Sequence, residues 1–514
     1  MKTYLLFADR DLPAEPNPLP NAEALTEDLG LDPLIAAMGT GDGFLEDAAR
    51  RLLLEPLVDV DDILYRQQVL SDCMRNEGIV RELYALALDA FTRQRKVYGW
   101  LSDRNPGATL SHAVQVLEIF VSELRTLRLI AVDHAHEFES AGFRRFFEMT
   151  VRELDDAYFA EIDRHLRRLR FRGSVMISAH LDRGGKPSAL VLRRPEREKR
   201  TIGERWSALT HPIPAFRIAE RDEAGADALN EFRGKGMNLV ADALARSTDH
   251  ILSFFSMLRL ELGFYIGCLN LIHALDDRTQ HTSMPVPVAQ AQQMFACDEL
   301  YDPSLALVGS AAGGEGVAVV GNTIDAGSHP LMMVTGANRG GKSTFLRSRG
   351  LAQLMMQAGM VVPARAMTAT VASGVFTHFK REEDTELASG KFDEELARMN
   401  EIVGQITPAS LMLFNESFAA TNEREGSEIA RQIVRALLDS GIRVVYVTHL
   451  YDLAHGFVGD ADAFFLRAER ERTFRLVVGE PLPTSFGGDL YRDIFRTDPA
   501  NGRPVEAFAT TRGT

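Results

Sequence analysis

One glycine-rich segment constrains the fold of this chain more than any other feature of the sequence. Residues 336–343 read Gly-Ala-Asn-Arg-Gly-Gly-Lys-Ser, and they follow Leu331-Met-Met-Val-Thr, a pattern typical of a buried strand. A helical pattern then runs from Thr344 to Gln357 and is ended by Gly359. Strand, glycine loop and helix in this order predict a loop whose backbone N–H groups surround phosphates at the positive end of a helix.

The loop predicts an ATP site with Mg²⁺. Lys342 has the length to reach the outer phosphates, and the hydroxyl of Ser343 is a magnesium ligand in loops of this kind. Nine consecutive residues are expected to contact the nucleotide: Gly336, Ala337, Asn338, Arg339, Gly340, Gly341, Lys342, Ser343 and Thr344.

Two further strand patterns end in residues suited to ATP hydrolysis. Leu411-Met-Leu-Phe ends in Asn415-Glu416, where a carboxylate near the metal and a base for water are expected. Glu416 is the candidate base. Asn415 is a candidate magnesium ligand and stands where aspartate is expected. This replacement predicts weaker metal binding and slow hydrolysis. His449 follows Val444-Val-Tyr-Val-Thr and is a second catalytic candidate, able to contact the γ-phosphate or its attacking water.

The rest of the chain predicts a helical region before an α/β domain. Residues 1–42, rich in Pro, Gly, Asp and Ala, are expected to be a loosely structured lead-in. Residues 43–285 predict an all-helical core and lever domain, with a small arginine-rich strand pair at 168–205 and a long helix from Met237 to Asp276. Residues 286–514 alternate strand and helix patterns, which predicts a P-loop ATPase domain whose sheet carries helices on both faces.

Charge and composition limit the possible classes of protein. The formal net charge of −15 argues against a surface that binds nucleic acid all round, although a local basic patch stays possible. Three widely separated cysteines, Cys73, Cys268 and Cys297, argue against a disulfide framework and favour the cytoplasm. No run of about 18 apolar residues is evident, so no membrane span is expected.

The segment Leu331–Phe457 resembles the ATPase domain of the MutS family of DNA mismatch repair proteins. The resemblance rests on Thr335-Gly-Ala-Asn-Arg-Gly-Gly-Lys-Ser-Thr, Gly359-Met-Val-Val-Pro-Ala, Phe414-Asn-Glu-Ser and Val447-Thr-His. Residues 52–67 and the long helix resemble, more loosely, the helical core and lever of the family. The resemblance implies a homodimer with composite ATP sites, in which Ser389 is the candidate contact to the partner's γ-phosphate. It also predicts a shortened form without the mismatch-reading N-terminal domain.

Two functions stay open at this point. The first is an ATP-dependent DNA-binding ATPase that acts on mismatched, branched or distorted DNA in repair or recombination, with repair proteins as further partners. The second is a nucleotide-gated dimeric switch that binds protein partners, with little DNA contact and slow or no hydrolysis. The arginine-rich stretch 164–205 favours the first, unless its interleaved acidic residues neutralise it; the acidic net charge and Asn415 favour the second.

Overall fold

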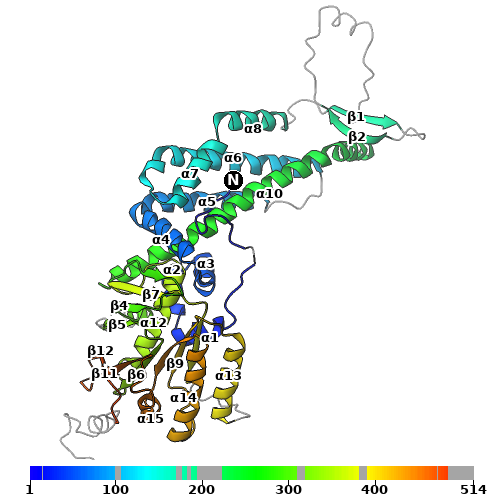
Figure 1. Ribbon diagram of the computed structural model, residues 1–514. Coiled ribbons are helices and arrows are strands. Elements are labelled where there is room, and N and C mark those ends of the chain that lie inside the picture. Colours follow the sequence, from blue (N-terminus) through cyan, green and yellow to red (C-terminus); the bar gives the residue numbers. More distant parts are fainter. Residues whose placement is uncertain are drawn as a thin grey trace, which may run out of the picture. The chain divides into compact units, whose positions relative to one another are not determined.

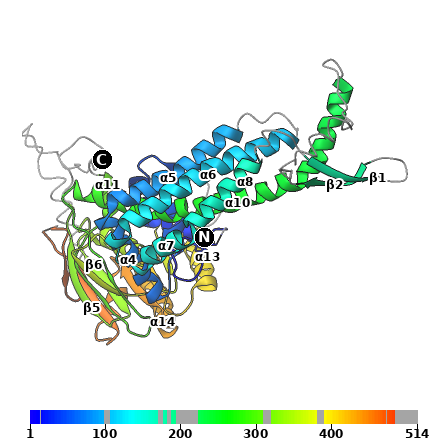
Figure 2. The ribbon, with the colours of Figure 1, turned by 90° about the horizontal axis from the view of Figure 1, so that it is seen from above.

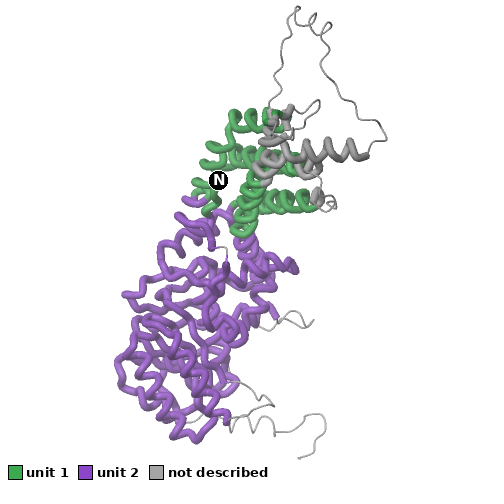
Figure 3. Tube along the Cα trace, turned by 90° about the vertical axis from the view of Figure 1, so that its right-hand side faces the viewer, with its two compact units in different colours: residues 1–4, 76–139, 143–262 green, residues 5–75, 140–142, 263–514 purple. Residues whose placement is uncertain are grey.

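A computed structural model describes nine segments of the chain: residues 1–13, 15–98, 106–169, 176–181, 187–193, 223–308, 319–380, 390–471 and 473–483. The chain divides into two compact units, coloured separately in Figure 3. The first comprises Met1–Tyr4, Asn76–Glu139 and Phe143–Leu262, and the second comprises Leu5–Arg75, Ser140–Gly142 and Gly263–Thr514. Residues 43–285 thus contribute to both units, and the domain boundaries at 42 and 285 stay predictions.

The first unit consists of helices and one strand pair. Helices α5 and α6 pack against each other, and α8 packs on α6 (Figure 2). The strands β1 and β2 are antiparallel, with Met176 opposite Arg193, which confirms the predicted strand pair. The elements are α5 (Glu77–Tyr98), α6 (Pro106–His134), η1 (Ala135–Glu137), most of α7 (Ala141–Glu153), α8 (Asp156–Leu169), β1 (Met176–Leu181), β2 (Pro187–Arg193) and the first part of α10 (Glu223–Asp276).

Helix α10 is the long helix that the sequence predicts, but it begins at Glu223 instead of Met237. Its heptad seam is largely buried: Phe255, Leu258 and Leu262 in the first unit, then Tyr265, Leu269 and Ile272 in the second. Within the described residues, Arg246–Asp276 is long and apolar enough to cross a membrane by length and composition alone, with a mean hydropathy of 1.4. This corrects the expectation that no such stretch exists. The window is 61% buried inside the structure, a property shared by core helices of globular proteins.

The second unit contains two sheets. The larger has the order β12-β11-β6-β10-β9-β8, and all neighbours are parallel except the β11–β12 pair. The smaller has the order β3-β7-β4-β5 and is mixed. The strands are β3 (Val286–Val288), β4 (Phe295–Leu300), β5 (Asn322–Gly327), β6 (Leu331–Gly336), β7 (Ala366–Thr370), β8 (Val375–Phe379), β9 (Leu411–Asn415), β10 (Arg443–Val447), β11 (Ala463–Ala468) and β12 (Leu476–Val478).

Helices cover both faces of the larger sheet (Figure 1). On one face, Met333, Phe414 and Tyr446 share a buried core with Val434 of α14. On the other face, α12 approaches so closely that a Cβ on Gly350 would lie 2.8 Å from a methyl of Leu413. The helices of this unit are α1 (Ala22–Leu29), α2 (Asp32–Gly39), α3 (Gly43–Leu54), α4 (Val60–Arg75), α11 (Pro303–Val308), α12 (Lys342–Gln357), α13 (Lys391–Gln405), α14 (Glu423–Asp439) and α15 (Tyr451–His455).

Residues 1–42 correct a prediction. The expected loose lead-in contains helices α1 and α2, and Leu25, Leu29 and Leu34 are completely buried. Two of the Pro and Gly residues that suggested a loose segment lie at helix ends. Pro33 stands in the first turn of α2, and Gly30 ends α1 with a φ of 66°, a left-handed conformation that glycine adopts without steric cost.

Candidate nucleotide site

The three segments predicted to form the site meet at one edge of the larger sheet. Strand β10 lies between β6 and β9, and all three are parallel, so their carboxyl ends share an edge. Hydrogen bonds fix these ends to one another. The Thr448 amide donates to the Val334 carbonyl at 3.0 Å, and the Glu416 amide donates to the Val447 carbonyl at 2.9 Å. The fold therefore brings the glycine loop, Asn415-Glu416 and His449 together.

The glycine loop requires backbone conformations that most residues avoid. Gly336 and Gly341 have φ values of 102° and 88°, and Arg339 adopts a φ of 60° without being glycine. A Cβ on Gly336 would lie 2.5 Å from the carbonyl oxygen of Ala468 on the neighbouring strand. Gly341 is the residue before helix α12, which begins at Lys342, two residues earlier than the sequence pattern predicts. The glycines thus permit both the tight turn and the close packing on β11.

Lys342 places a positive charge inside the loop. Its ammonium group donates hydrogen bonds to the carbonyls of Gly336 at 3.1 Å and Ala337 at 3.0 Å. Only 5% of the residue is exposed, and this burial lowers the pKa of Lys342, while the nearby Glu416 carboxylate acts in the opposite direction. The loop therefore holds the lysine against backbone carbonyls, a pairing that a phosphate group is able to replace.

Ser343 and Asn415 are in direct contact. The Ser343 hydroxyl donates to the Asn415 side-chain oxygen at 2.8 Å, so the start of α12 meets the end of β9. Both groups present oxygen atoms, the ligand type that Mg²⁺ prefers. Among the described residues, no group of three or more His, Cys, Asp and Glu side chains could hold a metal by itself. This donor set fits Mg²⁺ whose remaining ligands are phosphates and water.

Glu416 and His449 form the second pair that the fold assembles. The Nδ1 atom of His449 lies 3.7 Å from a carboxylate oxygen of Glu416, and both side chains are partly exposed. The neighbouring His449 ring lowers the pKa of Glu416, and this effect outweighs the opposing effect of burial. Glu416 also has a φ of 53°, a conformation that is strained for a non-glycine residue and recurs at functional sites.

A pocket of about 250 Å³ opens beside this pair. Its lining includes Gly336 of the loop, His449, and Glu423 from the first turn of α14. The Glu423 carboxylate accepts a hydrogen bond from the Tyr451 amide at 3.2 Å, which ties α14 to the segment after His449.

One residue that the sequence reasoning missed is Lys380. It directly follows β8, its amide donates to the Asn415 carbonyl at 3.0 Å, and its charge also lowers the pKa of Glu416. The rule that singled out His449, a polar residue after a parallel strand, would have found Lys380 if applied to β8. The predicted trans contact Ser389 lies outside the described residues.

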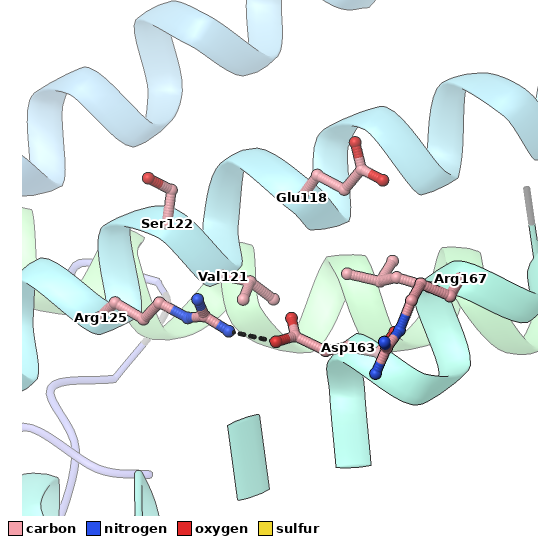
Figure 4. A pocket seen from close by; sticks show the side chains of 7 residues that line it. Glu118, Val121, Ser122, Arg125, Asp163 and Arg167 are labelled. Atoms are coloured by element: carbon pink, nitrogen blue, oxygen red, sulfur yellow. Dashed lines mark hydrogen bonds and ion pairs between the residues drawn. The ribbon is translucent and has the colours of Figure 1, made fainter. Parts of the chain in front are cut away.

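The first unit contains a larger pocket of about 460 Å³ between α6 and α8, but its lining does not suit phosphate. Arg125 of α6 donates to Asp163 of α8 at 2.8 Å, and Figure 4 shows the two side chains pointing toward each other. Arg167 and Glu118 add one charge of each sign. The lining is thus close to neutral, and its volume alone does not make it a nucleotide site.

Two family models match the chain, one after the other. The model described as MutS2 N-terminal domain matches residues 58–278, and the model described as MutS domain V matches residues 332–463. The second match contains the whole glycine loop together with Asn415, Glu416 and His449. The chain belongs to the MutS family.

Curated relatives agree with this assignment. The "Endonuclease MutS2" of Brevibacillus brevis is 33% identical over 161 residues, which is 30% of this chain and 20% of the relative. That of Lactiplantibacillus plantarum is 34% identical over 170 residues, 32% of this chain and 22% of the relative. The "MutS protein homolog 4" of Mus musculus is 31% identical over 151 residues, 29% of this chain and 15% of the relative. The chain thus matches about a fifth of the length of these MutS proteins.

Proposed function

We propose that this MutS-family chain is a P-loop ATPase that binds ATP with Mg²⁺ at Gly336–Thr344. The observation that carries the proposal is the contact between Ser343 and Asn415, 2.8 Å apart, at the start of the helix that follows the glycine loop. It supports the proposal because two oxygen atoms able to ligate Mg²⁺ lie beside the N-terminus of α12, where the backbone N–H groups of the loop favour negative charge.

Each residue of the site then has a distinct role. The backbone of Gly336–Gly341 surrounds the phosphates, and Lys342 exchanges its carbonyl partners for phosphate oxygens. Ser343 and Asn415 hold Mg²⁺, which neutralises phosphate charge when bound. The ionised Glu416 accepts a proton from the attacking water, and the neighbouring His449 helps to keep Glu416 ionised.

Asn415 makes slow hydrolysis part of this proposal. An amide oxygen ligates Mg²⁺ or accepts a hydrogen bond from metal-bound water, but it carries no charge. In the related ATPases an aspartate holds the metal at this position. We therefore expect the site to bind Mg²⁺ more weakly, and to hydrolyse ATP more slowly, than it would with aspartate at position 415.

Binding of a fluorescent ATP analogue to the wild type and to Lys342→Ala tests the nucleotide site. Lys342→Ala should weaken binding by about tenfold or more, because it removes charge-assisted hydrogen bonds to phosphate. Lys391→Ala, which removes an exposed lysine at the start of α13, is the matched control and should bind as the wild type does. Equal affinity of wild type and Lys342→Ala would exclude the assigned site.

We further propose that the chain acts as a cytoplasmic homodimer on mismatched, branched or distorted DNA, in repair or recombination. The support is membership of the MutS family together with the arginine-rich stretch 164–205. In this proposal residues 43–285 grip DNA, while residues 286–514 provide the ATPase. Gel-shift affinity for branched duplex should fall steeply as salt is raised, because phosphate contacts release counterions. An affinity that is independent of salt would contradict DNA binding through that stretch.

A nucleotide-gated switch for protein partners is the second candidate. It is favoured by an ion pair that neutralises an arginine in the described part of the stretch. Arg164 pairs with Glu161 at 3.1 Å. Recovery of protein partners from nuclease-treated extract, in an ATP-dependent manner and without detectable DNA affinity, would favour this switch over the DNA-binding ATPase.

A further inference from the structure

A separate pocket lies at the opposite edge of the larger sheet from strand β12. Strand β8 is the edge strand, and β10 and β9 separate it from β6, which carries the glycine loop. Helices α1 and α13 both pack against β8. Between them is a pocket of about 390 Å³, which is within the range of small-molecule sites. Nothing in the proposed ATP chemistry uses this pocket.

Among the described residues, the outward-facing backbone of β8 lacks a hydrogen-bond partner at Thr377, which lines this pocket. Because β8 pairs only with β9, the backbone groups of alternate residues point away from the sheet. The Asn21 side chain donates to the Val375 carbonyl at 2.8 Å, and Arg398 donates twice to the Phe379 carbonyl at 3.2 Å. Thr377, midway between these two residues, lines the pocket, and no hydrogen bond within the described part of the chain reaches its outward-facing backbone.

Two side-chain oxygen atoms of the pocket lining also have no partner among the described residues. Thr377 is only 4% exposed, and its hydroxyl makes no hydrogen bond within the described part of the chain. The side-chain oxygen of Asn21 is buried and unbonded there in the same way, since only its amide nitrogen is used. A buried polar atom without a hydrogen bond destabilises the structure, so a ligand that donates to these oxygens would be favoured.

The charge of the lining indicates what such a ligand is. The described residues that line the pocket include four carboxylates and one cationic side chain, Arg398, which donates to the Phe379 carbonyl. Carboxylates, a carbonyl, a hydroxyl and an amide oxygen all accept hydrogen bonds. The carboxylates would repel an anion, whereas a cation with several N–H donors is able to donate hydrogen bonds to these acceptors. The four carboxylates belong to Glu23, Glu27, Asp28 and Glu401.

We propose that this pocket binds a small organic cation with several N–H donors, an alkylammonium or a guanidinium group. Its N–H groups donate to the outward face of Thr377 and to the Asn21 oxygen, and its charge lies among the carboxylates of α1 and α13. The cation is either a free amine or the side chain of a lysine or arginine. This site is independent of the nucleotide site, and it does not rest on the proposed ATPase function.

Titration calorimetry on the full chain, without ATP or DNA, tests the proposal. The probes are 1,4-diaminobutane, agmatine, an N-acetyl-lysine methylamide and tetramethylammonium, which has the charge but no N–H donor. We expect saturable binding of the first two or of the lysine derivative, and none of tetramethylammonium. Saturation by the free amines indicates a metabolite-like ligand, and saturation by the lysine derivative alone indicates a partner's side chain; both support the site.

Two variants and one control locate the binding. Thr377→Val keeps the shape of the side chain and should weaken binding by about tenfold, the effect of one hydrogen bond to a charged group. Glu401→Gln, at an exposed position that folding does not depend on, should weaken it by roughly two- to fivefold. Asp439→Asn, an exposed acidic residue at the end of α14, should have no effect. Absence of saturable binding, equal binding of tetramethylammonium, or unchanged binding in both variants would overturn the proposal.

Discussion

Replacement of Asn415 by aspartate is the sharpest test of the proposed site. The side-chain oxygen of Asn415 accepts a hydrogen bond from the Ser343 hydroxyl at 2.8 Å, so the new carboxylate occupies the same place with little change in shape. It adds a full negative charge to a site that already contains Lys342 and Glu416. We expect Asn415→Asp to bind Mg²⁺ more tightly and to hydrolyse ATP faster than the wild type.

The size of the effect follows from charge and exposure. Two unit charges 4 Å apart interact by about 4 kcal/mol at an effective dielectric constant of about 20. This value is the upper limit for the attraction between the new carboxylate and each unit of charge on Mg²⁺. Desolvation of the new carboxylate and its attraction to Lys342 offset most of this. Changes next to a metal ligand alter metal affinity by about 10- to 100-fold. We therefore expect a gain of about 1.4–2.7 kcal/mol in Mg²⁺ affinity.

The assay measures ATP turnover and binding of an ATP analogue as Mg²⁺ is varied, for the wild type and two variants. Asn422→Asp is the matched control, because it makes the same substitution at the N-cap of α14, where Asp and Asn cap equally well. Asn415→Asp should reach half-saturation at about 10- to 100-fold lower Mg²⁺ than the wild type or the control. If the Mg²⁺ requirement of Asn415→Asp equals that of the wild type, Asn415 does not face the metal and the assigned role is wrong.

Two further predictions concern the stability of the site. Gly336→Ala should lower the free energy of unfolding, measured by urea titration, by about 1–3 kcal/mol more than the control Gly41→Ala does. Both positions have positive φ, but only a Cβ at position 336 would contact Ala468. An equal loss in the two variants would show that this close approach is absent. The neighbouring His449 ring lowers the pKa of Glu416 below its ordinary 4.5, so ionised Glu416 stabilises the folded state above that pH, and this contribution is lost as pH falls through the lowered pKa. His449→Ala should therefore be most destabilising near about pH 7 and lose the Glu416-dependent part of its effect in acid; a destabilisation that does not change with pH would contradict this.

Local patterns in the sequence were sufficient for the strands and the helix that surround the glycine loop. Strands β6, β9 and β10 lie on the apolar runs that predicted them. The runs are easy to recognise because strands buried on both faces are uniformly apolar and end at polar residues. The seam of α10 was visible for a similar reason, since burial of one helix face imposes spacings of three and four. Motif and spacing also named Ser343, Asn415, Glu416 and His449 as one site.

Other features depend on contacts between segments that are distant in the sequence. Residues 1–42 looked loose because Pro and Gly mark both disordered segments and helix ends, and only the packing of Leu25 and Leu29 against the rest of the unit distinguishes the two. Lys380 was overlooked because its relevance comes from the neighbouring strand β9, through its bond to the Asn415 carbonyl.

What the sequence alone determined, then, is the chemistry of the glycine loop and the order of strands and helices, because both arise from residues adjacent along the chain. The tertiary structure decided which strands are neighbours, and so which strand ends share an edge. It set the distances of 2.8 Å between Ser343 and Asn415 and 3.7 Å between His449 and Glu416. It also decided that Thr377 lies on an edge strand, because strand order in a sheet depends on long-range pairing that no local pattern encodes.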